Sequence, residues 1–510
     1  MPKRSIKVCL RLAFAVLVLL SVFLLVERIR GQVSLARYKA TLERSGELLT
    51  AQQVMTQRTK SNARPREVFA AIERLPNGNV VLNHYPPQMR ATASGRAVVG
   101  FREDFWTEDK TNYTWAQLSS ELKGHEATLK EIQLALLTPV FQSDLDLAEG
   151  SKLKFPHLAP AKSLSRWYGV QAQLALHEGR PGEAVEALVA QLQAPKLLAE
   201  DRVLISELVR FAMAGIALST TWEAMQAEGW TDQDLLRLQT TWARLEFLPG
   251  FTRALEGERA FILTSAVAAR GSNQAAYDYV RSDEGGPLFP SEPDGEISWG
   301  WISPHGAIYE FFRKRIYCPI WRFAWSHQDE RRLLGEIQLL LTSVRVMSAA
   351  RSFVEREELL SNLKRVVTEH GFYNRLRYPQ PGLIMSLAHS VQRVARTETD
   401  RSFALCAIAL KRYAQRHGTL PGALADLVPE FLETVPVDYF DGKAMKYHLN
   451  ASGNFTLYSV GQDGKDDGGD LSLMPEVTLA RNNWLRRDYV WPLPASPEEV
   501  VAYRAEAGKY

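Results

Sequence analysis

The chain has 510 residues, enough for two to four domains, and its 46% hydrophobic and 23% charged residues are typical of an ordinary globular protein. The formal net charge is only +3 and no long basic run occurs, so nothing favours a nucleic-acid partner. No CxxC pair or Cys/His cluster indicates zinc. Cys318 and Cys406 either pair in an oxidising compartment or, as we favour, remain two separate buried thiols.

The N-terminus carries an apolar run of nineteen residues, Val8–Val26, with Arg11 as its only charge. As a helix rising about 1.5 Å per residue, the run is roughly 28 Å long, close to a bilayer core of about 30 Å. Basic residues at its start favour a cytoplasmic N-terminus. We therefore predict that residues 1–30 anchor the protein in the inner (cytoplasmic) membrane as a single pass, with the bulk of the chain extracytoplasmic. A cleaved signal peptide is the alternative.

Residues 31–115 are predicted to form a stalk and a small β-containing segment. Residues 32–60 look helical and polar, as expected of a stalk that leaves the membrane. The stretches NGNVVLNHYPP and GRAVVGFRED combine short β-branched runs with Asn-Gly and Pro-Pro pairs, which are typical of short strands and turns.

Residues 116–382 are predicted to be mainly helical. The stretch SRWYGVQAQLALHEGRPGEAVEALVAQLQ has two apolar-periodic segments on either side of residues 179–182, which resembles one helical hairpin of the tetratricopeptide kind. No second clear copy follows, so the pattern indicates a helical bundle or an irregular solenoid.

Two parts of this region stand out. Residues 271–306 are dense in Gly, Pro, Ser and Asp and are predicted to form a long loop. Trp299, Trp301 and His305 lie near its end; they either bury the loop against the helices or, as the less favoured alternative, belong to a functional loop. Aromatic residues are frequent over 309–325, and we interpret them as core.

Residues 395–510 are predicted to form a separate C-terminal module. Phe403, Cys406, Leu410 and Tyr413 lie on one helical face, and Gly418 is a good helix stop. The alternating runs KAMKYHL and NFTLYSV, joined by NASG, predict an antiparallel hairpin. The whole chain is thus assigned to the α+β class, with a transmembrane helix, a mainly helical middle, and a C-terminal helix plus hairpin.

The C-terminal pattern resembles the globular part of the major pseudopilin of bacterial type II secretion systems. In that family the order is Pro-x-Asp, an aromatic residue, a Tyr, and then Ser-x-Gly-x-Asp-Gly followed by Gly-Gly and a further Asp. The matching residues are Pro436, Asp438, Phe440, Gly442, Tyr447, Ser459, Gly461, Asp463, Gly464, Gly468, Gly469 and Asp470. The whole chain also resembles uncharacterised membrane-anchored proteins of planctomycete and verrucomicrobial type.

The resemblance implies a calcium site in the loop YSVGQDGKDDGGD. Carried over by position, the ligands are the Val460 carbonyl and the carboxylates of Asp463, Asp470 and Asp488, while Asp466 and Asp467 either join them or face water. Calcium takes six to eight oxygen ligands, and glycines let a loop turn its carbonyls inward. The alternative is a solvated Gly/Asp turn.

The sequence therefore predicts a non-enzymatic function. We expect a membrane-anchored extracytoplasmic scaffold or interaction protein with a calcium-stabilised pseudopilin-like module, linked to other envelope or type II secretion proteins. Roughly 370 residues separate the anchor from the helix at 401, so the module looks borrowed and a pilus subunit is less favoured. The alternative is an envelope hydrolase. Since no GxSxG, HExxH or P-loop motif occurs, its site would be assembled from residues distant in sequence, such as Glu258 and His305.

Overall fold

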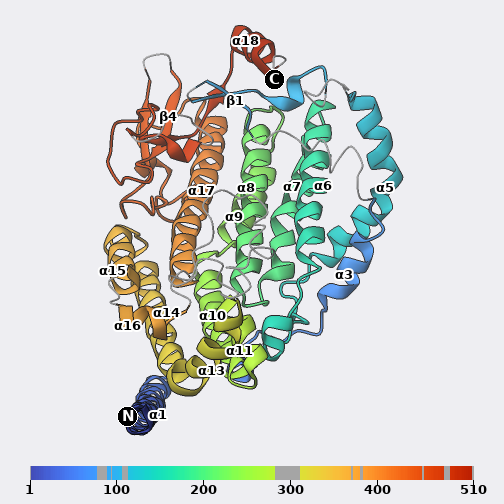
Figure 1. Ribbon diagram of the computed structural model, residues 1–510. Helices are drawn as coiled ribbons and strands as arrows, with labels where there is room; N and C mark the ends of the chain where they lie inside the picture. Colours follow the sequence, from blue (N-terminus) through green and yellow to red (C-terminus); the bar gives the residue numbers. More distant parts are fainter. Residues whose placement is uncertain are drawn as a thin grey trace.

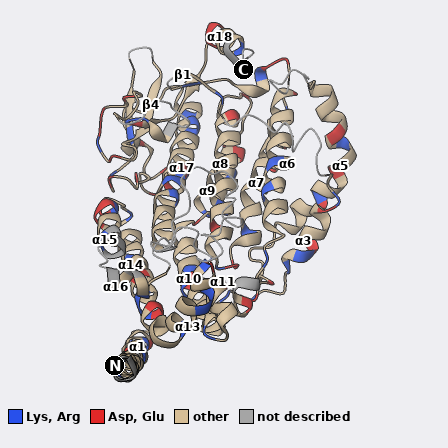
Figure 2. Cartoon of the chain, viewed as in Figure 1, with Lys and Arg blue, Asp and Glu red and all other residues tan. Residues whose placement is uncertain are grey.

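The computed structural model describes residues 2–76, 89–93, 95–105, 113–281, 310–368, 372–379, 383–450, 453–475 and 483–507. Helices dominate these residues, and the described strands form two three-stranded sheets, in agreement with the α+β class. Figure 1 shows the helices side by side as an upright body, with the strands at one end and α1 at the other. Charged residues of both signs are spread over this body (Figure 2).

α1 is one continuous helix over Pro2–Arg44, and it is long and apolar enough to cross a membrane. Its first part exposes its apolar side chains, from Val8 to Ile29. Its second part packs against the body, because Leu35 and Leu42 are buried together with Leu263 and Leu334. The predicted stalk is therefore helical, but it lies along the body instead of standing apart from it.

Among the described residues, two other helical segments meet the length and composition of a membrane span, Leu204–Met225 and Glu310–Ala350. The first is α8, and 72% of its most apolar window is buried inside the protein. The apolar residues of α8 thus belong to the protein core. Figure 1 shows α8 in the middle of the body.

The helical body contains the predicted hairpin. α6 ends at His177 and α7 begins at Pro181, and Gly179 between them has φ +69°, a conformation that glycine adopts without strain. Capping boxes start α2, α5 and α9 at Thr50, Thr114 and Thr231. The helices and 3₁₀ turns of this part are α2 (Ala51–Thr56), α3 (Pro65–Ile72), η1 (Gly100–Arg102), α5 (Trp115–Ala135), η2 (Leu147–Lys152), α6 (Leu158–His177), α7 (Pro181–Gln193), η3 (Ala194–Leu198), α8 (Leu204–Met225), α9 (Asp232–Ala243) and α10 (Leu248–Ala269).

The predicted long loop is partly helical. α11 (Asn273–Arg281) buries Ala276, Tyr277 and Val280, so the amphipathic spacing within YDYV outweighs the surrounding loop-like composition. Trp299, Trp301 and His305 lie outside the described residues.

A long helix then runs over Glu310–Ala350. Two turns of it are widened to π-helical hydrogen bonding, and Pro319, which lacks an N–H, sits between them. Its parts are η5 (Arg313–Tyr317), α13 (Cys318–Ile320), η6 (Trp321–Trp325) and α14 (Ser326–Ala350), followed by α15 (Arg356–Thr368) and α16 (Phe372–Arg377).

The aromatic residues of this helix divide between core and surface. Trp321 and Trp325 are buried, but Phe311, Phe312 and Phe323 are exposed. The interpretation of the whole aromatic stretch as core is therefore wrong for these three phenylalanines, because only one face of the helix meets the body.

The C-terminal part begins with α17 (Leu383–His417), which is longer than the helix expected from residue 401. The expected hairpin is present: β3 (Lys446–Leu449) pairs antiparallel with β4 (Phe455–Ser459), and β4 pairs with β5 (Tyr489–Val490). The remaining elements are η7 (Leu424–Leu427), η8 (Asn483–Leu485), β6 (Leu493–Pro494) and α18 (Pro497–Ala507).

The second sheet joins residues 91–97 to a strand near the C-terminus. β1 (Ala91–Ala93) pairs antiparallel with β2 (Arg96–Ala97), and β2 pairs in parallel with β6. Of the two stretches expected to contain short strands, GRAVVGFRED forms β2, whose sheet is completed by β6, and NGNVVLNHYPP lies outside the described residues.

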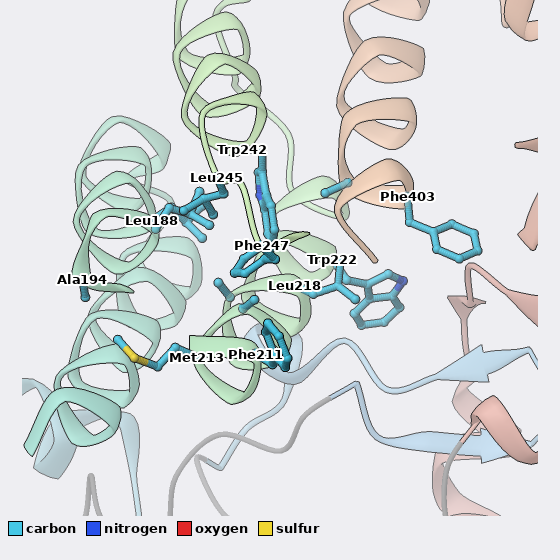
Figure 3. Packing of buried hydrophobic residues seen from close by; sticks show 14 of the residues in the cluster. Leu188, Ala194, Phe211, Met213, Leu218, Trp222, Trp242, Leu245, Phe247 and Phe403 are labelled. Atoms are coloured by element: carbon cyan, nitrogen blue, oxygen red, sulfur yellow. The ribbon is translucent and has the colours of Figure 1, made fainter. Parts of the chain in front are cut away.

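One hydrophobic cluster extends from Val68 to Trp491 and thus joins the helical body to the C-terminal part. Figure 3 shows Phe403 of α17 and Trp222 of α8 in this cluster. Trp222 is fully buried and donates its indole N–H to the carbonyl of Pro492 at 2.7 Å. Cys318 and Cys406 are both buried and unpaired, as favoured from the sequence.

Candidate metal centre in the C-terminal loop

Asp438, the aspartate of the Pro-x-Asp pattern, holds the end of β4 in place. Its side chain is fully buried and accepts hydrogen bonds from Phe440 N (3.0 Å), Ser459 Oγ (3.0 Å) and Val460 N (2.9 Å). Burial raises the pKa of Asp438, and the amide hydrogen bonds act in the opposite direction. Both oxygens of this carboxylate are bonded to the chain, so its role is structural.

The loop after β4 turns sharply because of its glycines. Gly461 has φ +67°, and a Cβ at this position would lie 2.5 Å from the carbonyl oxygen of Arg487. Residue 461 must therefore be glycine for the loop to approach the chain that leads into β5. This close approach brings the residues after β4 next to those before β5.

Asp488 lies at that junction. The ladder register pairs Ser459 with Tyr489, so the next residues outward are Val460 on one chain and Asp488 on the other. Asp488 is fully buried, and its Oδ2 accepts the amide N–H groups of Gly469 (2.6 Å) and Asp470 (3.0 Å). Its other oxygen, Oδ1, is buried and has no hydrogen-bond partner among the described residues.

Asp467 also has a carboxylate oxygen without a hydrogen-bond partner in the part of the chain that the structure describes. One of its oxygens accepts a bond from Arg487 Nη1 at 3.3 Å, but its Oδ2 is buried without a hydrogen-bond partner among the described residues. Burial raises the pKa of Asp488 to about 6, the nearby charge of Asp467 adds to the rise, and the amide hydrogen bonds only partly offset it. The buried Asp488 and the partly exposed Asp467 beside it thus each have one buried oxygen without a hydrogen-bond partner among the described residues.

The structure places the other predicted ligands differently. Asp463 is exposed and accepts the N–H of Lys465 at 3.1 Å within its own turn. The Asp470 carboxylate accepts Ser472 N (2.9 Å) and Ser472 Oγ (2.7 Å), and these bonds lower its pKa. Of the three predicted carboxylates, only Asp488 therefore presents a buried, unpartnered oxygen.

The long insert between Asp470 and Asp488 does not separate the two residues. Asp488 N donates to the Asp470 carbonyl at 3.0 Å, and Arg487 N donates to the Ser472 carbonyl at 3.0 Å. The two ends of the insert therefore lie side by side. The sequence pattern leaves Asp467 as an optional ligand, and only the fold shows that it, and not Asp463, lies beside Asp488.

The donor set fits a hard cation in part. The Val460 carbonyl, Asp467 Oδ2 and Asp488 Oδ1 are oxygen donors of the kind calcium binds, but they number fewer than the six it requires. Among the described residues, no group of three or more His, Cys, Asp or Glu side chains is arranged to hold a metal. Further donors would have to be water or the carboxylates now turned to the surface.

A second polar cluster resembles a hydrolytic triad in composition but not in arrangement. Asp201 Oδ2 accepts Ser206 Oγ at 2.6 Å and faces His157 Nε2 at 2.9 Å, and Asp201 Oδ1 accepts Ser143 Oγ at 2.7 Å. In a triad the histidine lies between the serine and the aspartate, whereas here the aspartate binds all three groups. The cluster therefore joins the loops of Ser143 and Asp201 to the starts of α6 and α8.

The charged group on α10 is also structural. Arg259 is fully buried and donates to the Leu48 carbonyl and to Glu47 at 2.8 Å each, as well as to Gln338. Glu258 accepts the N–H of Leu204 at 2.8 Å, and burial raises its pKa. Both side chains thus fix the packing of α10.

A cleft of about 650 Å³ lies between α9, α17 and the segment around 429–439. Its buried Glu398 accepts the N–H groups of Phe247 (3.1 Å) and Leu248 (2.9 Å) and the Nε of Arg401 (2.9 Å). The described residues that line it include no histidine or cysteine. Its charges hold three elements together and indicate no reaction.

Comparisons of the chain with protein-family models, with curated proteins and with solved structures found no match.

Proposed function

We propose that this protein is a membrane-anchored, extracytoplasmic scaffold or interaction protein whose C-terminal module resembles a pseudopilin head and is stabilised by calcium. α1 holds it in the inner membrane, and the helical body presents the module to other envelope proteins, in the first place those of type II secretion. The observation that carries the proposal is the buried Asp488 carboxylate with an unpartnered oxygen beside a second one on Asp467.

The unpartnered oxygens support a cation because a buried polar atom without a partner costs roughly 1–3 kcal/mol, and more when it is charged. The Arg487 contact to Asp467 does not reach Asp488 Oδ1. A divalent cation held between the Val460 carbonyl, Asp467 and Asp488 would neutralise both carboxylates and tie the loop after β4 to β5. Calcium would then contribute directly to the folding of this end of the molecule.

The anchor supports the localisation. The apolar residues from Val8 to Ile29 are exposed along α1, an arrangement that suits lipid and not water. The basic residues before the run favour a cytoplasmic N-terminus, which places the body and its C-terminal module outside the cytoplasm.

The test is amide hydrogen exchange of residues 460–470 in the full chain in detergent, with millimolar calcium or with chelator. We use the full chain because one core joins the module to the helical body. Calcium should slow exchange by about tenfold or more, since a ligand at one hundred times its dissociation constant stabilises the bound state by about 2.7 kcal/mol. Asp488→Asn and Asp467→Asn should abolish the difference between calcium and chelator.

Asp463→Asn is the matched control in the same loop, because its carboxylate is exposed and bonded only to its own turn. Loss of the calcium effect in this variant too would show that Asp463 joins the ligands, as the pseudopilin resemblance implies. Equal exchange of the wild-type chain in calcium and in chelator would refute the calcium site.

A further inference from the structure

The first part of the helix over Glu310–Ala350, residues 310–325, packs against the body with only one face. Cys318, Trp321, Ala324 and Trp325 are buried there in a small cluster with Tyr277 and Val280 of α11. The stacked rings of Trp321 and Tyr279, with centroids 5.1 Å apart, extend this contact. This face holds the segment firmly in place.

The opposite face is apolar and open. Phe312, Ile316 and Phe323 are 54%, 43% and 40% exposed, and Phe311 beside them is 59% exposed. Because two turns of this segment are π-helical, the exposed fractions and not the α-helical spacing define this face. Single exposed apolar residues are normal, but a row of large ones on one helix marks an interaction surface.

The membrane anchor passes beside this segment. Leu24 of α1 packs against the buried cluster of Cys318 and Trp321, and on the open face the Arg28 guanidinium lies 4.8 Å from the ring centroid of Phe323. The apolar run ends at Val26, and Arg28 lies two residues further along, or about 3 Å of helix. Phe323 is therefore at the level where α1 leaves the hydrocarbon core.

The charges around the face suit an anionic lipid surface. Lys314 and Arg315 are exposed on the segment itself, and Arg30 of α1, 72% exposed, lies near its end. A helix with one apolar face and basic residues at its edge is typical of elements that lie in the membrane interface. Basic residues near an anionic surface are attracted to it within about a Debye length.

We propose that residues 310–325 form a second membrane contact, an interfacial helix that lies in the headgroup region with Phe312, Ile316 and Phe323 facing the lipid. The proposal rests on α1 as the anchor, as in the proposed function, but not on the calcium site. The contact fixes the orientation of the body on the membrane, since one transmembrane helix alone leaves rotation and tilt free. Lipid is favoured over a protein partner because the membrane anchor passes beside this segment.

The test measures the membrane depth of three side chains of nearly equal exposure in the full chain. Single cysteines replace Ile316 (43% exposed), Leu449 in β3 at the far end of the body (43%) and Val18 in α1 (44%), in a Cys9→Ser background. Each carries a fluorescent label, with one chain per nanodisc of phosphatidylcholine and phosphatidylglycerol. Lipids with a nitroxide near the headgroup or near the acyl end quench the label according to depth.

The label at Ile316→Cys should lose about half its fluorescence or more to the headgroup nitroxide, and less to the acyl-end nitroxide, as expected of an interfacial helix. The label at Leu449→Cys should be unaffected, and the label at Val18→Cys should respond most to the acyl-end nitroxide. Replacing Lys314 and Arg315 by Gln should reduce the quenching at position 316 in phosphatidylglycerol discs and not in pure phosphatidylcholine.

Equal, weak quenching at 316 and 449 would overturn the proposal while leaving the anchor intact, provided that position 18 is quenched. Stronger quenching at 316 by the acyl-end nitroxide would also overturn it, in favour of a second transmembrane segment. Absence of quenching at position 18 would remove the anchor on which both proposals stand. Because each disc holds one chain, contact between two copies cannot produce the expected result.

Discussion

Glu47 and Asp488 are two carboxylates in different parts of this molecule that differ in whether the chain supplies a cation. Burial acts to raise the pKa of Glu47, but hydrogen bonds from Arg345, Arg259 and Gln338 outweigh it and lower the pKa to about 2. Burial also acts on Asp488, where the chain offers only amide groups and a second carboxylate, and its pKa rises to about 6. The first centre is complete in itself, and the second is not, which is why we assign an external cation to it.

The largest expected effect comes from removing a buried arginine from the Glu47 centre. Arg259→Met should lower the free energy of unfolding by about 3 kcal/mol, because the Leu48 carbonyl loses its buried donor and Glu47 loses one of its two arginines while it keeps Arg345. The guanidinium-chloride unfolding midpoint of the full chain in detergent measures this loss.

Arg237→Met is the matched control, since Arg237 pairs with Glu186 while both are roughly 40% exposed (42% and 43%). An exposed pair contributes about 0–1 kcal/mol. Similar losses for the two variants would contradict the view that burial makes the Glu47 centre special.

The second effect concerns pH. Asp400 of α17 is another carboxylate of the C-terminal part with an unpartnered oxygen, Oδ1, among the described residues. Burial raises its pKa to about 8, and Arg396 and Tyr489 only partly oppose this rise. The folded chain then holds a proton on Asp400 that the unfolded chain releases near pH 4. The contribution of Asp400 to the free energy of unfolding is therefore fully present below that pH and is lost as pH rises towards 8.

For this single proton the free energy of unfolding falls by up to about 1.4 kcal/mol per pH unit. Asp400→Asn, which stays neutral, removes this contribution and should therefore flatten the pH dependence of the melting temperature between pH 5 and pH 8. Asp463→Asn, at an exposed carboxylate, serves as control. An unchanged slope in Asp400→Asn would refute the assignment.

A smaller effect tests how closely the loop after β4 approaches residue 487. Gly461→Ala should cost about 2–3 kcal/mol, because it adds both a positive-φ strain and a Cβ that meets the Arg487 carbonyl at 2.5 Å. Gly453→Ala, at φ +80° with open space around it, should cost only about 1 kcal/mol from the backbone strain. Equal losses of thermal stability would mean that the approach is looser than described.

The smallest effect belongs to the exposed part of the same loop. Ser472→Ala removes the hydroxyl donor to Asp470, but water can replace it because the Asp470 side chain is 43% exposed. We expect a change of under about 0.5 kcal/mol in the unfolding free energy. A loss above about 1 kcal/mol, twice the surface norm, would place Asp470 among the structurally essential carboxylates after all.

The sequence by itself determined the features that depend on neighbouring residues. The apolar run Val8–Val26 fixes a helix of membrane length, and the alternation on either side of NASG fixes the β3–β4 hairpin. The spacing around Gly179 fixes the α6–α7 hairpin. Each follows from periodicity or turn chemistry within a short stretch, so no tertiary contact is needed to infer it.

Only the tertiary structure decided which polar and aromatic residues are buried, and against what. Arg259 meets Glu47 across more than two hundred residues of chain, and Phe323 is exposed while Trp321 is buried because one face of their helix meets the body. Asp488 rather than Asp463 presents an unpartnered oxygen because backbone hydrogen bonds between the two ends of the insert bring Asp488 against Asp470. Such contacts depend on the packing of distant segments, which local patterns do not encode.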